Sequence, residues 1–434
     1  MVGSVLPTAD KPMEDDGYDD AAATLLRIAN QQFADFEGLR AFLPRAILLY
    51  RECAKVAEAQ QGITLSQVLR DKTGLDIEEG MFLAFGLHTL LYEGKRGHLL
   101  ERDIMTQSAE FPGITKERVA RLFDWLSTDY AGFRKAGELP EVGAAEGYEP
   151  YNLNPLVMYP IMRTPRGQYV IPIVDHLFRR VTTGLFYDLI NPIDPKETGK
   201  AGYIIGKAIE SYVARLIEDL PSHGRLIPEV KYAPGKTTCE WILDEPDGIV
   251  LVECKRVSLR QRAKTTGQRE DVKRDISRED AVADGIAKLM ETAQAIRSGH
   301  VEGVSAEKRV IPVLITLDQF FLANSRYIRN IIEEVLDEKK NKLGEFQYQI
   351  CPIPEFEELC RLLSATGQHL SAALAAKIDG VHNIPGDFPT AQWDFSAWVT
   401  HVWPEGAAGQ IPSHDKVYEY WFDMVMDHFR VSAS

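Results

Sequence analysis

The stretch that determines the fold is Val250-Leu-Val-Glu-Cys-Lys255, an apolar run that ends in charged residues. It lies within a predicted strand from Ile249 to Val257. Just before this strand, Pro246-Asp247-Gly248 has the composition of a tight turn, and Thr237 to Leu243 is a preceding predicted strand. The two strands therefore form a predicted hairpin.

The segments on either side of this hairpin show helical and strand periodicity in turn. Apolar residues every three or four positions predict a helix before it, and the almost wholly apolar run Val310 to Leu317 predicts a strand buried in the centre of a sheet. The order helix, three strands, helix, strand indicates an α/β core. The other predicted elements are a helix from Tyr203 to Leu220, a strand from Leu226 to Tyr232, a helix from the capping pattern Ser277-Arg-Glu-Asp280 to about Arg297, a helix from about Asn324 to Lys340, a strand from Phe346 to Ile350 and a helix from Pro354 to Ser364.

The whole chain divides into five predicted regions. Asp76 and Thr115 are predicted N-caps of helices in the second region, and Thr164-Pro-Arg-Gly167 is the predicted turn of a hairpin in the third, before a helix from about Asp175 to Ile190. The regions are an acidic mobile tail (1–20), a helical N-terminal domain ending in a linker (21–150), a hairpin and connecting helix (151–200), the α/β core (201–350) and a C-terminal helical, aromatic-rich extension that packs back on the body (351–434).

Length and composition exclude several classes of protein. The 434 residues are 45% hydrophobic and 26% charged, which is the composition of a globular chain with more than one folded unit. No apolar run approaches the roughly 18–20 residues that span a bilayer, and no secretion signal marks the N-terminus. Five cysteines without a CxxC pair favour neither a disulfide scaffold nor a zinc ribbon. We therefore expect a cytoplasmic protein with no membrane partner.

The charge distribution is uneven. The chain has 49 basic and 64 acidic residues, a formal net charge of −15, which argues against indiscriminate binding to nucleic acid. Between Lys255 and Arg274, however, eight residues are basic and only Glu270 and Asp271 are acidic. This basic stretch is either a solvated charged loop or a phosphate-binding segment.

The residues that can do chemistry gather around the predicted hairpin. Side chains alternate along a strand, so Glu253 and Lys255 emerge on one face, where a carboxylate can hold Mg²⁺ and an ammonium can orient or deprotonate a water. Glu240, 13 residues earlier on the first strand of the hairpin, can reach the same cation. Glu210 lies at the edge of the apolar stripe of the preceding helix; it is either a third acid of the site or an exposed helix glutamate.

Three segments together resemble the PD-(D/E)XK nuclease superfamily, which has the restriction-endonuclease-like fold. They are Gly206-Lys-Ala-Ile-Glu-Ser-Tyr-Val213, Cys239-Glu-Trp-Ile-Leu243 and Leu251-Val-Glu-Cys-Lys255, and the resemblance covers about residues 200–320. It implies an α/β (α+β) fold with a mixed sheet flanked by helices, here preceded by an all-helical N-terminal domain. It further implies that Glu210, Glu240 and Glu253 bind or organise Mg²⁺, or Mn²⁺ in its place.

The resemblance also implies roles for two lysines. Lys255 takes the place of the catalytic lysine, and Lys288 is the best candidate for a residue that the following helix directs toward the site. The second-strand acid of the family is usually aspartate, whereas this chain has Glu240, preceded by Cys239 instead of proline. Asp244 and Asp247 are the alternatives for this ligand, although both fall at or in the turn.

We therefore expect a metal-dependent nuclease that hydrolyses phosphodiester bonds, in DNA more than in RNA, in a restriction, repair or phage-defence setting. The expected nucleic-acid contacts are Arg256, Arg260, Arg262 and Lys264 of the basic stretch. A homo-oligomer and a partner protein of a defence system are both compatible with this expectation. The alternative is a non-catalytic nucleic-acid-binding or scaffolding subunit that keeps the fold. The motifs of zinc hydrolases (HExxH), P-loop nucleotide hydrolases and GxSxG hydrolases are all absent from the sequence.

Overall fold

Strand β9 (Gly248–Lys255) lies at the centre of a five-stranded sheet, and all eight of its residues are buried. The strand order is β11-β10-β9-β8-β5; β5, β8 and β9 are antiparallel neighbours, and β9, β10 and β11 run parallel. Glu245 pairs with Gly248, so the predicted turn through Pro246 and Asp247 is confirmed. The other strands of the sheet are β5 (Arg225–Pro228), β8 (Trp241–Glu245), β10 (Val310–Thr316) and β11 (Gln349–Pro352).

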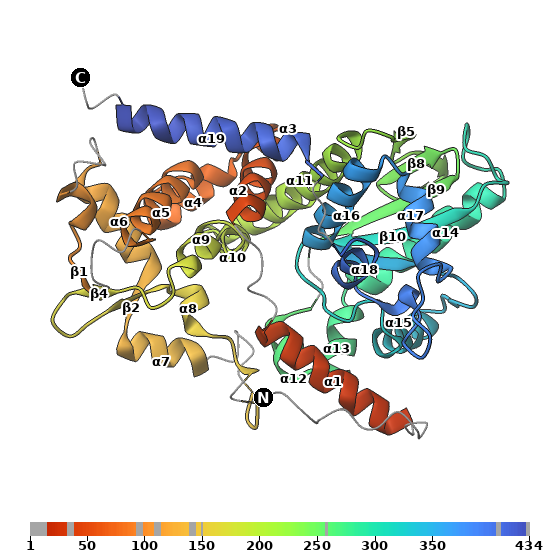
Figure 1. Cartoon of the computed structure of the whole chain (residues 1–434), viewed down its shortest axis with the longest axis horizontal. Helices are drawn as coiled ribbons and strands as arrows, with labels where there is room; N and C mark the ends of the chain where they lie inside the picture. The colour runs from red at the N-terminus through yellow and green to blue at the C-terminus, as the bar shows by residue number, and fades with distance from the viewer. Residues whose placement is uncertain are drawn as a thin grey trace.

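Helices cover both faces of this sheet, as a strand that is apolar on both sides requires. On one face, Leu251 and Leu314 pack with α14 (Val282–Arg297) and α15 (Arg326–Glu338). On the other, Val252 and Val313 pack with α11 (Thr198–Glu218), α16 (Ile353–Thr366) and α17 (Leu370–Ile378). Figure 1 shows the sheet and its helices on the right, with α11 running from them toward the helices on the left. The predicted element order and the mixed α/β class are thus confirmed.

The structure describes residues 15–32, 39–92, 99–107, 114–138, 145–148, 151–256, 259–404 and 409–430. Much of the predicted linker at 137–151, and Val257 at the end of a predicted strand, fall outside these ranges. A sheet with strand order β1-β4-β3-β2 corrects the prediction of an all-helical N-terminal domain. β1 (Leu99–Leu100) and β2 (Ser127–Asp129) are too short for periodicity to reveal them, and they flank the predicted hairpin of β3 (Ile161–Arg163) and β4 (Tyr169–Val170). A two-stranded hairpin, β6 (Lys231–Ala233) and β7 (Lys236–Thr237), projects beside β8.

The helices of the N-terminal half begin largely where the caps predict. Asp76 accepts a hydrogen bond from the backbone N–H of Glu79, and Thr115 accepts one from Arg118, so both predicted N-caps are confirmed. The predicted β3–β4 turn is also confirmed, with Gly167 at φ +80°. The helices are α2 (Leu39–Ile47), η1 (Leu48–Cys53), α3 (Lys55–Gln61), α4 (Leu65–Thr73), α5 (Ile77–Tyr92), η2 (Ile104–Gln107), α6 (Lys116–Leu126), α7 (Tyr130–Glu138), α8 (Pro155–Met158), α9 (Asp175–Val181), α10 (Leu185–Leu189) and η5 (Pro195–Glu197).

Several predicted elements differ from the structure. The predicted strand Leu226–Tyr232 is divided into β5 and β6, and the predicted strand Thr237–Leu243 into β7 and β8, so Glu240 directly precedes β8. The helix from Asp175 to Ile190 is interrupted at Thr182, whose hydroxyl donates to the carbonyl of Phe178. Residues 15–20, predicted as part of a mobile tail, begin α1 (Asp15–Gln32), which packs its Ala22 and Leu26 against the sheet domain (Figure 1). Residues 1–14 of that tail fall outside the described ranges. The capping pattern at Ser277 ends α13 (Arg269–Ile276) instead of starting α14.

The C-terminal extension packs back on the body, as predicted. Its last helix lies along α2, and its central part covers the β11 edge of the sheet, where Lys377 of α17 donates a hydrogen bond to Gln349 (2.5 Å) and lies 4.6 Å from the ring centroid of Phe395. The remaining elements are η6 (Thr390–Gln392), α18 (Phe395–Val402) and α19 (Pro412–Arg430).

A buried ion pair joins α2, among the helices of the N-terminal half (the helical region), to α16, which packs on the five-stranded sheet (the sheet and its helices form the sheet domain). Arg45 of α2 donates two hydrogen bonds to Glu357 of α16, at 2.6 and 2.8 Å, and the two residues are 7% and 0% exposed. Tyr212 of α11 donates to the same carboxylate (2.7 Å) and lies 2.6 Å from His414 of α19. Burial alone would raise the pKa of Glu357, but the Arg45 guanidinium, with His414 and Tyr212, lowers it overall. Four elements from three regions therefore meet at one carboxylate.

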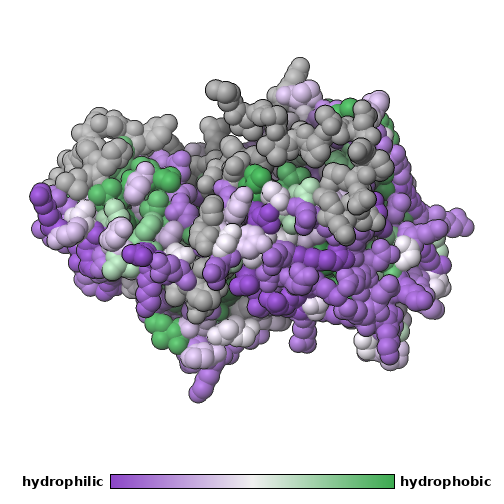
Figure 2. Space-filling model, turned by 90° about the horizontal axis from the view of Figure 1, so that it is seen from below, coloured by the Kyte–Doolittle hydropathy of each residue, from purple (hydrophilic) through white to green (hydrophobic). Residues whose placement is uncertain are grey.

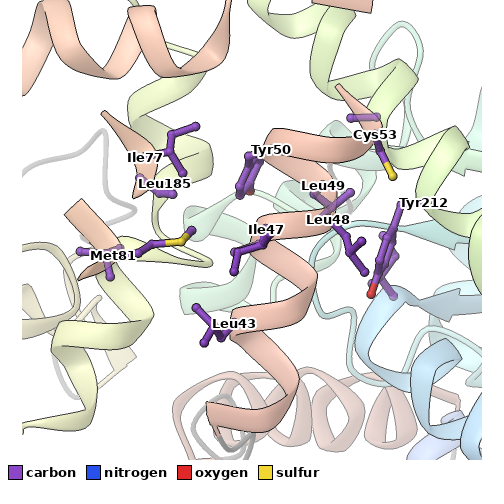
Figure 3. Packing of buried hydrophobic residues seen from close by; sticks show 14 of the residues in the cluster. Leu43, Ile47, Leu48, Leu49, Tyr50, Cys53, Ile77, Met81, Leu185 and Tyr212 are labelled. Atoms are coloured by element: carbon purple, nitrogen blue, oxygen red, sulfur yellow. The ribbon is translucent and has the colours of Figure 1, made fainter. Parts of the chain in front are cut away.

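Apolar packing surrounds this pair. Figure 3 shows Leu48 and Leu49 of η1 toward Tyr212, with Met81 and Leu185 on the opposite side of the segment. The residues of η1 form a π-helix, in which each turn holds about one residue more than an α-helical turn. The widened turn sits where buried side chains must face the sheet domain and the helical region at once.

We predict that Glu357→Gln lowers the free energy of unfolding by about 3–5 kcal/mol, because it leaves the Arg45 guanidinium buried without its counter-charge. The double variant Arg45→Met, Glu357→Leu should be less destabilised than Glu357→Gln alone. Denaturant unfolding of wild type, Arg45→Met, Glu357→Leu and the double variant measures the coupling energy between the two residues. Additive effects of the two changes would contradict the pairing.

We further predict that Lys377 makes stability depend on pH. Burial lowers the pKa of Lys377 from 10.5 to about 8, against the opposing effects of Asp394, Cys351 and Glu355. A lysine whose pKa is lower in the folded state contributes stability above its unfolded pKa, and loses it as the pH falls through the folded pKa. The free energy of unfolding of wild type, relative to Lys377→Met, should therefore fall by about 3 kcal/mol between pH 10.5 and pH 8, and then level off. A constant difference across that window would contradict the prediction.

Candidate active site

The candidate site lies at the end of β9. Glu253 and Lys255 are 4% and 8% exposed, and both side chains lie on the sheet face that α14 covers. Gly285 of α14 allows the close approach, because a Cβ there would lie 2.5 Å from Leu314 and 3.2 Å from Cε of Lys255. The glycine thus brings the helix onto a strand end that carries two charges.

Glu240 lies across the hairpin from Glu253. Trp241 pairs with Val252 at the end of the antiparallel register, and Glu240 directly precedes β8, with its carboxyl group beside that of Glu253. Oε2 of Glu240 accepts a hydrogen bond from the backbone N–H of Cys254 (3.0 Å), which closes the open end of the ladder. Burial, followed by the neighbouring Glu253 carboxyl, raises the pKa of Glu240 to about 9.

Only one of the two oxygens of the Glu253 carboxylate has a partner that is certain to carry a hydrogen. Its Oε1 lies 3.1 Å from Nζ of Lys255, whereas Oε2 is buried and has no hydrogen-bond donor among the described residues. The Glu240 carboxyl can fill that role only while it keeps a proton. A buried carboxyl group (Glu253) beside a half-buried one (Glu240) therefore favours a shared proton or a bound cation between them.

Lys255 is held between two carboxylates. Its Nζ lies 3.1 Å from Glu253 and 2.5 Å from Oδ1 of Asp280, in the turn between α13 and α14. Burial by itself would lower the pKa of Lys255, but Glu253 and Asp280 raise it above its ordinary value. In this arrangement Lys255 is a protonated hydrogen-bond donor, which favours orienting a water over deprotonating it.

Glu210 does not join the other two acids. Its carboxylate pairs with Lys207 of the same helix (2.7 Å), and α11 covers the sheet face opposite to that of Glu253. The indole of Trp241 donates to the backbone carbonyl of Glu210 (3.0 Å), which fixes α11 beside the start of β8. Burial raises the pKa of Glu210, Lys207 opposes this, and the Glu240 charge raises the pKa further. Within the described ranges, no group of three or more His, Cys, Asp or Glu side chains is arranged to hold a metal ion.

The other sequence candidates lie away from the carboxyl pair. The ammonium of Lys288 donates a hydrogen bond to the hydroxyl of Thr237 (2.8 Å) and lies 4.0 Å from the carboxylate of Glu229, so it is directed to these residues and not to Glu240 or Glu253. Asp244 binds Lys308 (2.7 Å) and faces Ile249 in the register, four residues before Glu253, or about 13 Å along the strand. Asp247 binds His369 (2.6 Å) in the turn itself. Of the three alternatives for the second-strand acid, only Glu240 is beside Glu253.

The basic stretch forms helices instead of a loop. It folds as α12 (Gln261–Thr266) and α13, and acidic partners lie close to most of its charges. Lys264 is paired with Asp318 and has only 11% of its side chain exposed. Arg260 lies 3.9 Å from Asp275, and Arg262 lies 3.1 Å from Asp271. Figure 2, seen from the side of Figure 1 on which these helices and α1 lie, shows a mainly hydrophilic face.

Arg256 differs from the rest of the stretch. It directly follows Lys255, and its guanidinium lies against α11, 2.5 Å from where a Cβ of Gly202 would be. Among the described residues, its guanidinium forms no hydrogen bond or ion pair with an acid. Of the four expected nucleic-acid contacts, Arg256 is therefore the one nearest to the candidate site and the least neutralised.

The sequence did not point to Asp280 as a site residue. Its position in Ser277-Arg-Glu-Asp280 indicated a helix start, and no spacing rule links it to Lys255, 25 residues earlier. Only the approach of the α13–α14 turn to the strand end reveals the contact. A larger surface hollow of about 710 Å³ lies elsewhere, between α3 and α4, where Glu58, Gln67 and Glu197 are among its lining residues.

The chain matches no protein-family model and no curated protein. In the part of the chain that the structure describes, no helix combines the length and the apolar character needed to cross a membrane.

The carboxyl pair fits a divalent cation in its chemistry. Mg²⁺ is bound by oxygen ligands and commonly takes only one or two protein carboxylates, with water and phosphate completing its shell. Glu240 and Glu253 supply such oxygens, and Oε2 of Glu253 is buried without a donor. The sequence predicted three metal ligands. In the structure only the carboxyl groups of Glu240 and Glu253 are adjacent, and the carboxylate of Glu210 pairs with Lys207.

We predict that Mg²⁺ stabilises the protein through this pair. At a concentration of 100 times the dissociation constant, a bound ion adds about 2.7 kcal/mol, or about 3 °C in Tm for a chain of this length. Glu253→Gln keeps the side-chain shape and should remove the increment. Asp247→Asn, an acid-to-amide change in the hairpin turn, should keep it. Thermal unfolding of wild type and both variants, with Mg²⁺ and with EDTA, measures the increase in Tm that Mg²⁺ causes. An equal increase in all three proteins would exclude Glu253 as a ligand.

Proposed function

We propose that this chain is a metal-dependent nuclease of the PD-(D/E)XK superfamily that hydrolyses phosphodiester bonds in DNA. The observation that supports this most is the set of Glu253 and Lys255, at the end of the buried strand β9, with Glu240, which directly precedes β8. Two adjacent carboxyls with an unsatisfied oxygen, beside a protonated lysine, suit a reaction that builds negative charge on phosphate. The three sequence segments that resemble the superfamily include all three residues.

The fold is compatible with this proposal. A helix (α11), an antiparallel three-stranded unit (β5, β8, β9), a crossing helix (α14) and a parallel strand (β10) follow in the order that the resemblance implies. Glu253 lies on β9 and Glu240 directly precedes β8, and the hydrogen bond from Cys254 to the Glu240 carboxylate keeps Glu240 close to β9. We propose that the five-stranded sheet is of the restriction-endonuclease-like type.

The roles of the residues follow from their surroundings. Glu240 and Glu253 would hold Mg²⁺ (or Mn²⁺), which when bound supplies positive charge to the phosphate and helps to activate the attacking water. Lys255 donates hydrogen bonds from a buried ammonium and stabilises charge that develops on phosphate oxygens. Arg256 is placed to contact a neighbouring phosphate of the strand. Glu210, paired with Lys207, adds negative potential beside the site without contacting the pair.

We further propose a prokaryotic restriction, repair or phage-defence role, acting on DNA more than on RNA. Such a role places the protein in the cytoplasm, alone, as a homo-oligomer or with a partner of a defence system. Most of the basic stretch is neutralised by its own acids, so we propose that DNA binding depends on few residues, with Arg256 first among them.

One observation favours the alternative of a non-catalytic subunit. Lys255 is paired with Glu253 and Asp280, and Glu210 with Lys207, so several of the charges already have partners within the chain. Structural ion-pair networks also perturb pKa values, as active sites do. The close approach of the Glu240 and Glu253 carboxyl groups is what such a network leaves unexplained.

We predict that wild type cuts DNA in the presence of Mg²⁺ and not with EDTA. Lys255→Met should lower the cleavage rate by about 10²–10⁴, because the group that positions the water and stabilises charge is lost. Lys308→Met, the same change at a lysine before β10 that pairs with Asp244 of β8, should cut at a rate near that of wild type. Plasmid, linear DNA and RNA serve as substrates, and anisotropy with Ca²⁺ in place of Mg²⁺ measures binding.

Three results would count against the proposal. If wild type binds DNA but cuts no substrate with any divalent metal, the non-catalytic reading replaces it. If Lys255→Met cuts as fast as wild type, Lys255 is not part of the machinery. If Lys255→Met loses binding and folding together, the lysine serves as a structural ion-pair partner.

A further inference from the structure

Asp280 has an unusual backbone conformation. It is one of three non-glycine residues with positive φ in the described ranges, at 55°, with Leu322 and Lys340. The left-handed region costs an L-residue roughly 1–2 kcal/mol, although aspartate and asparagine tolerate it better than most. Such a conformation persists only where the surrounding contacts hold it.

The contacts that hold Asp280 come from two helices. Its backbone N–H donates to Oδ2 of Asp284 in the first turn of α14 (2.9 Å). The other oxygen of Asp284 accepts from Lys339, at the end of α15 (2.5 Å). The turn between α13 and α14 is thereby tied to both helices that cover this face of the sheet.

The result of this conformation is the contact with Lys255. Oδ1 of Asp280 lies 2.5 Å from the ammonium, whose stem is confined by α14 at Gly285 and whose other partner is Glu253. An ammonium has three N–H donors, so this leaves one donor beyond the two carboxylates. Because the aliphatic chain of Lys255 and two of its N–H groups are fixed, the direction of the third N–H group is fixed as well.

The two partners differ in burial. The Asp280 side chain is 65% exposed, whereas Lys255 is buried and already pairs with Glu253. Asp280 is therefore a second carboxylate on this ammonium, and it reaches Lys255 from the exposed turn between α13 and α14. The contact restricts the direction in which the ammonium can point.

We propose that Asp280 is a positioning residue, which aims the free N–H of Lys255 at the phosphate or water in the site. This inference rests on the proposed nuclease function. It predicts that removing the Asp280 side chain impairs the chemical step and leaves substrate binding unchanged, because the binding groups stay in place.

The test compares three variants. Asp280→Gly removes the side chain but keeps the left-handed backbone without strain, and Asp280→Asn keeps a neutral acceptor. Lys340→Gly relieves the same kind of backbone at an exposed position and is the matched control. We expect Asp280→Gly to lower kcat about 10-fold to 100-fold at unchanged KM and DNA affinity, Asp280→Asn to lie between it and wild type, and Lys340→Gly to match wild type.

A second measurement does not depend on catalysis. In protein labelled with ¹⁵N-lysine, the ammonium of Lys255, identified by its absence in Lys255→Met, should give a slowly exchanging NMR signal. Asp280→Gly should broaden or abolish that signal, and Lys340→Gly should preserve it.

The outcomes separate the two proposals. If wild type cuts no nucleic acid, the nuclease function fails, and the NMR signal still reports whether Asp280 holds Lys255. If the enzyme cuts but Asp280→Gly has a wild-type kcat, or keeps the Lys255 signal, the positioning role is overturned. A gain in DNA affinity or kcat in Asp280→Gly would also overturn it, since Asp280 would then act by repelling phosphate.

Discussion

The complete burial of β9 is the constraint on which the rest of the structure depends. Eight consecutive buried residues need hydrogen-bonding partners on both edges and apolar cover on both faces. The β8 hairpin and the parallel strand β10 supply the edges; α14 and α11 supply the faces. Because the strand ends in Glu253 and Lys255, the same burial places two charges in a poorly solvated position, where each needs a counter-charge or a ligand.

A second buried carboxylate organises the remainder of the molecule. Glu357 receives Arg45 from the helical region and Tyr212 from α11, with His414 of the last helix against Tyr212. Such a site specifies one arrangement of its elements, because any other leaves a charge buried without a partner. Both carboxylate centres involve helices that pack on the central sheet, so helical region, sheet and C-terminal extension share one packed body.

The candidate site was predictable where it depends on a strand. Glu253 and Lys255 share a face by alternation, and the hairpin turn fixes Glu240 opposite Glu253. Helical residues were harder to place. Glu210 lies on the predicted helix, yet its carboxylate pairs with Lys207 of the same helix and not with the other acids. Lys288 likewise lies on the predicted helix, but its ammonium binds the hydroxyl of Thr237. Most charges of the basic stretch are paired with acids that are distant in sequence or on the next helix.

Local spacing in the sequence was enough to predict the periodic features: the order of strands and helices around β9, the turn at Pro246-Asp247, the N-caps at Asp76 and Thr115, and the closeness of Glu240 to Glu253. These follow from local spacing, which a single chain displays directly. Only the tertiary structure decided that α1 packs on the sheet domain, that short strands join the helical region, that Arg45 meets Glu357 and that Asp280 holds Lys255. Those contacts join residues with no fixed spacing, so they exist only once the elements have packed.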